Sequence, residues 1–170
     1  WLDVGGLRVD TRAPLGHIGT WLLDPADITI SSAATTDATA TGGVFAPDSG
    51  VSAANINVAD LVGALGSSNV TVSTANTGGA GLGDVNVNTA ITWTAPTTLS
   101  LNAARDVNVN QAITGTDGSL AVTAGRDVTV GAAITTTTGQ LGFTAVQDVK
   151  LNAATTITTS TNFGSVKFNP

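Results

Sequence analysis

The chain has 170 residues, of which 42% are hydrophobic and only 11% charged, and its net charge is −6. The absence of cysteine and the presence of a single histidine exclude disulfides, thiolate nucleophiles, iron–sulfur clusters and multi-histidine metal sites. The acidic balance argues against nucleic acid or an anionic membrane as a partner, and no apolar run approaches the roughly 20 residues of a membrane helix. The high content of threonine and valine, with no glutamate, favours strands over helices. A composition of this kind is typical of bacterial surface or secreted proteins, and we expect the chain, which opens with Trp1, to be a piece of a longer one.

Residues 1–83 show an irregular pattern. Short runs of alternating apolar and polar residues at 28–30, 56–58 and 70–72 predict strands. The segment 31–54 is rich in Ala, Thr, Ser and Gly and predicts a long loop that leaves the body of the fold.

A short helix is predicted near 58–65. Leu61, Val62 and Leu65 have helical spacing, and Asn57 precedes them as a candidate N-cap. Gly66 follows the last apolar residue and is a typical helix end.

Residues 84–170 carry an internal repeat of about 21 residues. Four similar segments, such as Asp106-Val-Asn-Val-Asn-Gln-Ala-Ile113, begin with aspartate and are spaced 22, 21 and 21 residues apart. They start at Asp84, Asp106, Asp127 and Asp148. A second, leucine-initiated segment recurs in step at Leu99, Leu120 and Leu141.

Each repeat contains short runs of period-2 alternation, which indicates strands. A unit of this size cannot enclose a core alone, so it must stack on its neighbours, about 4.8 Å away, through parallel strand pairs. Stacking in register predicts four inward columns of aliphatic side chains. These are Val85, Val107, Val128 and Val149; Val87, Val109, Val130 and Leu151; Ile91, Ile113 and Ile134; and Leu99, Leu120 and Leu141.

The predicted fold is therefore all-β, a right-handed parallel β-helix with about 21 residues per coil. Residues 1–83 would form irregular coils and residues 84–170 regular ones, in one continuous solenoid. The alternative is an antiparallel sandwich or barrel, which also has short strands and frequent turns but does not require identity at a fixed period.

The repeat aspartates would form a ladder in such a stack. Like charges this close must be solvated, paired or metal-bound, and Arg105 and Arg126 lie beside two of them. The simplest interpretation is a turn aspartate that accepts backbone N–H bonds. The alternative is a calcium site, which needs about 6–8 oxygen ligands, although no calcium-loop motif is present.

Asparagine recurs at Asn88, Asn110 and Asn152, which predicts an amide ladder; the alternative is a polar shelf for sugar hydroxyls. Trp21 and Trp93 have two interpretations. Exposed, either could stack on a pyranose ring, which makes them candidate glycan contacts; buried, they would fill a wide core, and the position of Trp93 two residues after Ile91 favours burial. No motif indicates a cofactor or a resident metal.

Four segments together resemble the filamentous-haemagglutinin-like exoproteins of bacterial two-partner secretion. They are Gly19-Thr-Trp-Leu-Leu-Asp-Pro-Ala-Asp-Ile-Thr-Ile30, Ile56-Asn-Val-Ala-Asp-Leu-Val-Gly-Ala-Leu65, and the Ala-Arg-Asp-Val and Gly-Arg-Asp-Val patterns at 104–107 and 125–128. The resemblance implies the stalk of a secreted adhesin on a Gram-negative cell surface, exported through an outer-membrane transporter. The family's N-terminal secretion domain is not visible in this sequence.

The sequence thus favours a structural and adhesive rod without enzymatic activity. Its expected partners are adjacent coils, further copies of itself joined end to end, and a host or matrix glycan or protein receptor. One alternative is a carbohydrate-binding module that reads its ligand with 31–54 or Trp93. The other is a polysaccharide-degrading enzyme, for which Asp106, Asp127, Arg105 and Arg126 are the clustered candidates; their repeat positions indicate architecture rather than chemistry.

Overall fold

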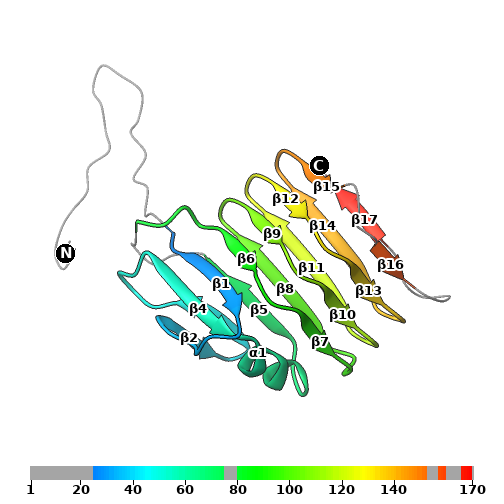
Figure 1. Ribbon diagram of the computed structural model, residues 1–170, viewed down its shortest axis with the longest axis horizontal. Helices are drawn as coiled ribbons and strands as arrows, with labels where there is room; N and C mark the ends of the chain where they lie inside the picture. The colour runs from blue at the N-terminus through cyan, green and yellow to red at the C-terminus, as the bar shows by residue number, and fades with distance from the viewer. Residues whose placement is uncertain (1–24, 75–79, 153–156, 160–165, 170) are drawn as a thin grey trace.

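The computed structural model describes residues 25–74, 80–152, 157–159 and 166–169, and this part of the chain is mostly β (Figure 1). Trp21 lies outside the described residues. The elements in chain order are β1 (Asp27–Ser31), β2 (Ala38–Thr41), β3 (Val44–Pro47), β4 (Ala53–Asn57), α1 (Val58–Leu65), β5 (Val70–Ser73), β6 (Val85–Val87), β7 (Ile91–Trp93), β8 (Thr98–Ala103), β9 (Val107–Val109), β10 (Ile113–Gly115), β11 (Ser119–Ala124), β12 (Val128–Val130), β13 (Ile134–Thr136), β14 (Leu141–Ala145), β15 (Val149–Leu151), β16 (Ile157–Thr159) and β17 (Val166–Asn169).

The strands form three sheets that run along the long axis of the molecule (Figure 1). The first sheet has the order β15-β12-β9-β6-β1-β4, the second β16-β13-β10-β7, and the third β17-β14-β11-β8-β5-β3-β2. Consecutive strands from β6 onward lie in different sheets, and each pairs in parallel with its counterpart one repeat away. This parallel pairing is compatible with a solenoid and excludes the antiparallel sandwich or barrel for these strands.

The register aligns the repeated aliphatic residues. Val107 pairs with Val85 on one side and with Val128 on the other, and Ile113 pairs with Ile91 and Ile134. The same register brings together Val87, Val109 and Val130, and Leu99, Leu120 and Leu141, and all of these side chains are buried. Each repeat forms one layer of the fold, and the layers start one residue before the repeat aspartates, at Gly83, Arg105, Arg126 and Gln147.

Two of the predicted core residues are not fully buried, although Val149 still packs against the core. Val149 is only half-buried and Leu151 is 48% exposed, although their partners Val128 and Val130 are fully buried. Both lie on β15, the outermost strand of the first sheet, which has a paired neighbour on one side only in the described part of the chain. Their columns therefore end one layer earlier than the repeat predicts.

The loop predicted for 31–54 is wrong. This segment contains β2, β3 and the start of β4, and β2 pairs with β3 in the one antiparallel strand pair of the described sheets. Gly42 and Gly43 connect β2 and β3, and both have positive φ (58° and 83°), as a two-residue hairpin turn requires. The hairpin extends the third sheet through β3, and β4 extends the first sheet beside β1.

The helix predicted near 58–65 is confirmed as α1. The Asn57 side chain caps it by accepting a hydrogen bond from the Ala59 N–H at 2.7 Å, and Leu61 and Leu65 face the core. α1 packs against β7, the outermost strand of the second sheet, and the carbonyl of Leu65 accepts a 2.6 Å bond from the Thr97 hydroxyl. The described part of the chain has no other helix, and α1 is too short to cross a membrane.

Candidate functional site

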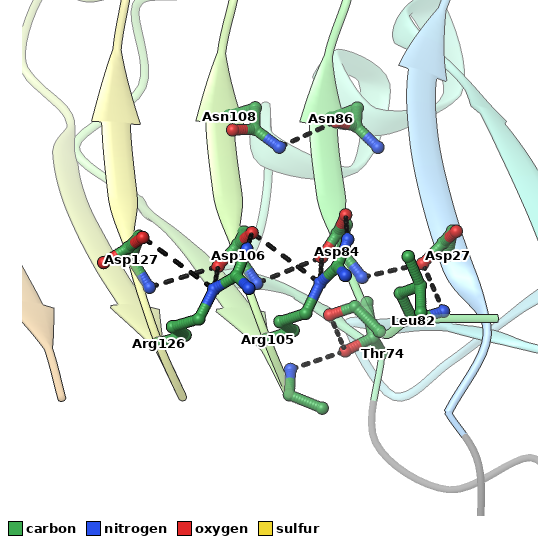
Figure 2. Close-up of polar contacts among 12 residues, drawn as sticks. Asp27, Thr74, Leu82, Asp84, Asn86, Arg105, Asp106, Asn108, Arg126 and Asp127 are labelled. Carbon is green, nitrogen blue, oxygen red and sulfur yellow. Dashed lines mark hydrogen bonds and ion pairs between the residues drawn. The ribbon is translucent and has the colours of Figure 1, made fainter. Parts of the chain in front are cut away.

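A ladder of five aspartates follows the edge of the first sheet where its strands begin. They are Asp27, Asp84, Asp106, Asp127 and Asp148. The carboxylate of each aspartate accepts the backbone N–H of the next, at 2.9 Å for the first step and 3.2 Å for the other three. The N–H bond expected of a turn aspartate is present, but it comes from the following layer and not from the aspartate's own turn (Figure 2).

A basic side chain from the following layer also binds each of the three carboxylates of Asp84, Asp106 and Asp127. Arg105 donates to Asp84 through Nε (2.7 Å) and Nη2, and Arg126 binds Asp106 in the same two-pronged way, with Nε at 2.8 Å (Figure 2). Such a planar fork matches the two oxygens of a carboxylate, which makes the bond both strong and directional. The ladder is therefore a series of ion pairs between layers, and the arginines separate carboxylates that would otherwise repel.

The last junction uses a different base. Gln147 stands where the two earlier layers have arginine, and Lys150, two residues after Asp148, reaches back to Asp127 with its Nζ 2.8 Å from Oδ2. The first junction has Gly83 at this position, and there Asp27 accepts the N–H groups of Leu82 and Asp84 at 2.9 Å each. The strength of the contact between layers thus varies along the ladder.

The ion pairs shift the protonation of both partners. Burial raises the pKa of Asp84, but the hydrogen bond from Arg105, the N–H of Asp106 and the charges of Arg105 and Arg126 together hold that pKa below its usual value. The hydrogen bond from Lys150 is the main cause that lowers the pKa of Asp127. The same hydrogen bonds raise the pKa values of Arg105, Arg126 and Lys150.

Asp148 is the exception in the ladder. Its side chain is 65% exposed, against 12% for Asp84, and Lys150 of its own layer lies 3.5 Å from it. The inner aspartates have a backbone N–H and a base from the next layer, whereas in the described part of the chain no following layer reaches Asp148. Among the described residues, Asp148 is the one ladder position with an open outer side.

The calcium alternative finds no support in this arrangement. The oxygens of Asp84, Asp106 and Asp127 already contact basic side chains and backbone N–H groups, which repel a cation. Within the described ranges no group of three or more histidine and acidic side chains is placed to hold a metal ion.

Asparagine side chains form a second set of bonds between layers, on and beside the first sheet. Asn108 Nδ2 donates a hydrogen bond to Asn86 Oδ1 (3.0 Å; Figure 2), and Asn110 Nδ2 donates one to Asn88 Oδ1 (2.8 Å). Gly131 stands between Asn110 and Asn152, so the structure does not bring these two side chains together. The amide ladder predicted for Asn88, Asn110 and Asn152 is therefore interrupted after its first two members.

Trp93 is not a surface residue and cannot serve as a glycan contact. It is 3% exposed, and its indole N–H donates to the carbonyl of Thr97 at 3.3 Å. The ring lies against two glycines of the next layer: a Cβ would be 2.6 Å from ring carbon Cζ2 at Gly115 and 2.1 Å from Nε1 at Gly118. The buried interpretation of Trp93 is the correct one, and the glycines make room for the ring.

Two polar residues of this region were not found from the sequence. Asp27 starts the ladder, and its signal was present, because Asp27-Ile-Thr-Ile30 has the same apolar alternation as the later repeats. Thr74 is fully buried and bridges two segments: its hydroxyl donates to the Gly83 carbonyl at 3.1 Å and accepts the Ala104 N–H at 2.8 Å (Figure 2). No pattern in the sequence distinguishes Thr74 from its many threonine neighbours.

A scan against protein-family models finds no match to this chain, and searches of the curated proteins and of the solved structures find none either. The resemblance to filamentous-haemagglutinin-like exoproteins therefore rests on the residue patterns alone. What it implies about export and adhesion is a proposal.

Proposed function

We propose that the chain is a right-handed parallel β-helix with about 21 residues per coil, and that it serves as a structural stalk segment of a secreted bacterial adhesin. The observation that carries this proposal is the ladder of ion pairs between layers. The repeated charged residues bind one another across layers, as Arg105 binds Asp84 and Arg126 binds Asp106, and they do not converge on a cavity. The right hand is expected because parallel crossovers strongly prefer it.

The outward faces support a spacer more than a binding module. In the second sheet the outward residues Thr92, Thr114 and Thr135 pair in register, and they are exposed or half-exposed. Such a face is polar but uncharged, and it has no large aromatic side chain that could stack on a sugar. Repetition of one surface along the axis suits a rod that separates functional parts.

The resemblance supplies the cellular setting of the proposal. In this setting the protein is exported through an outer-membrane transporter and reaches the Gram-negative cell surface. Its partner there would be a host or matrix receptor, either a glycan or a protein. Nucleic acid is not an expected partner, since the net charge is −6.

Neither alternative function gains support from the geometry. The carbohydrate-binding alternative loses Trp93, which is buried, and the 31–54 loop, because that segment contains the β2–β3 hairpin and the start of β4. The polysaccharide-degrading alternative needs Asp106 and Arg126 free to meet a substrate, yet these two residues are bonded to each other. We therefore propose no enzymatic activity.

The stalk proposal predicts that length can be added in whole repeats. Four extra copies of residues 104–124, inserted in register, should lengthen the particle by about 19 Å, at about 4.8 Å per layer, with the melting temperature preserved. Small-angle X-ray scattering and circular dichroism measure these two quantities. A matched insertion of three and a half copies of the same segment should lower the melting temperature, because the extra half repeat breaks the register. Equal behaviour of the two insertions, or no gain in length, would contradict the proposal.

A glycan array tests the adhesive part of the proposal. A stalk segment should retain no glycan above the level of the Trp93→Leu variant. Strong retention of one glycan class would instead favour the carbohydrate-binding alternative.

A further inference from the structure

We infer that the end formed by β15, β16 and β17 is a docking edge for one further parallel layer of the same repeat, which Asp148 recognises through an incoming basic residue. In the described part of the chain the opposite end is blocked at the first and second sheets, so a whole parallel layer fits at one end only. This inference rests on the proposed stalk function and specifies its partner.

The closed end is built from the segment 31–65. The N–H and C=O groups of Asn55 on the outer side of β4 are bonded to Thr36, at 2.9 and 3.0 Å, and the Asn55 side chain donates to the carbonyls of Ala33 and Ala34. At the third sheet, β2 runs antiparallel to β3 and also contacts β4, so the hairpin folds across this end. At the second sheet, α1 covers β7 (Figure 1). The first and second sheets are therefore blocked at this end, and a layer that must pair with all three sheets cannot be added there in register.

The opposite end presents three open edges. β15, β16 and β17 are the outermost strands of their sheets, and no described strand pairs with their outer sides. At the first sheet the end of the aliphatic columns is partly uncovered, because Val149 and Leu151 are partly exposed while their partners one layer inward are buried. Unpaired backbone groups next to exposed aliphatic side chains form a template for another strand.

The pattern of the ladder indicates which strand would fit beside β15. Every inner carboxylate receives the backbone N–H of the next aspartate, and from Asp84 onward it also receives a base from that same layer. The base stands just before the next aspartate, as Arg105 and Arg126 do, or two residues after it, as Lys150 does. An incoming layer with this pattern would give the Asp148 carboxylate the backbone N–H and the basic partner that the inner aspartates have. A layer without a base would instead bury a carboxylate that has only Lys150 beside it.

A second copy of this molecule is a poor occupant of the edge. Its 31–65 end is closed, and two open ends placed together would bring Asp148 close to the Asp148 of the other copy, with repulsion between them. The geometry therefore selects a further repeat layer, of the type of residues 125–145, over end-to-end association of whole copies.

The test is to append a copy of residues 125–145 after Pro170 of the full chain. Asn169 pairs with Thr144, and Thr144 with Thr123, so this copy continues the register. We expect amide exchange in Val149–Leu151 to slow at least about tenfold, and the appended segment to resist proteolysis. The Arg126→Ala change made only in the appended copy, or Asp148→Asn, should remove most of this protection. Asp117→Asn, which alters an exposed aspartate on another part of the surface, is the matched control and should have no effect.

Three outcomes would overturn the inference. They are an unprotected appended segment, protection that is unaffected by both the Arg126→Ala copy and Asp148→Asn, and concentration-dependent end-to-end oligomers of the unmodified chain in sedimentation. Successful internal insertion of residues 104–124 together with an unprotected appended layer would reject the docking edge and leave the stalk proposal standing. Failure of the internal insertion would reject the stalk itself.

Discussion

Arg105 binds Asp84, twenty-one residues earlier in the chain, and not primarily its sequence neighbour Asp106. Its Nε atom is 2.7 Å from Asp84 Oδ1 but 3.6 Å from Asp106 Oδ2. One arginine therefore fastens two layers together and also lies between two carboxylates of the ladder. The same relationship recurs between Arg126 and Asp106, which makes it a property of the repeat.

Removal of Arg105 should destabilise the fold. Arg105→Ala leaves the 12% exposed carboxylate of Asp84 without its main partner, and we expect a loss of about 1–3 kcal/mol in the free energy of unfolding. Urea denaturation followed by circular dichroism measures it. Arg126→Ala is the matched comparison and should cost less, because the Arg126 side chain is 44% exposed against 28% for Arg105. A larger effect for Arg126→Ala would contradict this ranking.

Stability should fall as the solution is acidified. The folded state lowers the pKa values of Asp84 and Asp127 below the ordinary 3.8, so the unfolded chain binds more protons near that pH. Their contribution is fully present above the unfolded pKa and is lost as the pH falls through the lowered folded pKa values. Urea midpoints measured from pH 6 to pH 3 should therefore decrease below about pH 5. The Asp84→Asn variant should show a shallower decrease, and an unchanged slope would count against the role of this pair.

The space around Trp93 should not tolerate a side chain on its glycine neighbours. In Gly118→Ala the new Cβ would lie 2.1 Å from the indole Nε1, so the ring must move, at a cost of about 1–3 kcal/mol. Differential scanning calorimetry should show a lower melting temperature. Gly142→Ala is the control, because no atom lies within 4 Å of its Cβ position, and it should leave the melting temperature almost unchanged. Combining Gly118→Ala with Trp93→Leu should give less destabilisation than the sum of the two single changes.

Asn57 should have two separable roles in the closed end. Its Oδ1 caps α1, and its Nδ2 donates to the carbonyls of Ser32 (3.1 Å) and Ala33 (2.9 Å). Asn57→Ala should lose both roles and cost about 0.5–2 kcal/mol for the cap alone. Asn57→Asp keeps an acceptor for the cap and loses the donor, so hydrogen exchange should speed up in 32–36 and stay slow in α1. Equal loss of protection in both segments would show that the two roles are not separable.

The sequence predicts the parallel strands and their register because the same residue types recur at a fixed interval. Val107 and Val128 share a position in the repeat, and the structure pairs them directly. The ion pairs were harder to predict, because adjacency in sequence links Arg105 to Asp106, whereas the direction of the side chain decides that it reaches Asp84. Sequence spacing carries no information on that direction.

The closed end was missed for other physical reasons. The strand β2 alternates only the small residues Ala and Thr, and β3 is apolar throughout, so period-2 alternation is weak and only Gly42 and Gly43 mark the turn. Asp27 escaped notice because the hairpin, β4 and α1 are inserted before the next ladder position, which places Asp84 57 residues later. The exposure of Leu151 depends on its place at the last strand, which a repeat pattern alone does not encode.

Because Gln147 stands where the two earlier layers have arginine, the last of the three ion-paired junctions is the weakest of them. Arg105 and Arg126 each donate two hydrogen bonds to the carboxylate of the preceding layer. At this edge the last layer has instead a single contact, from the half-exposed ammonium group of Lys150. We therefore expect that, on heating or under mechanical tension, the layer that contains β15 unfolds first. The inner layers, held by Arg105 and Arg126, should unfold later.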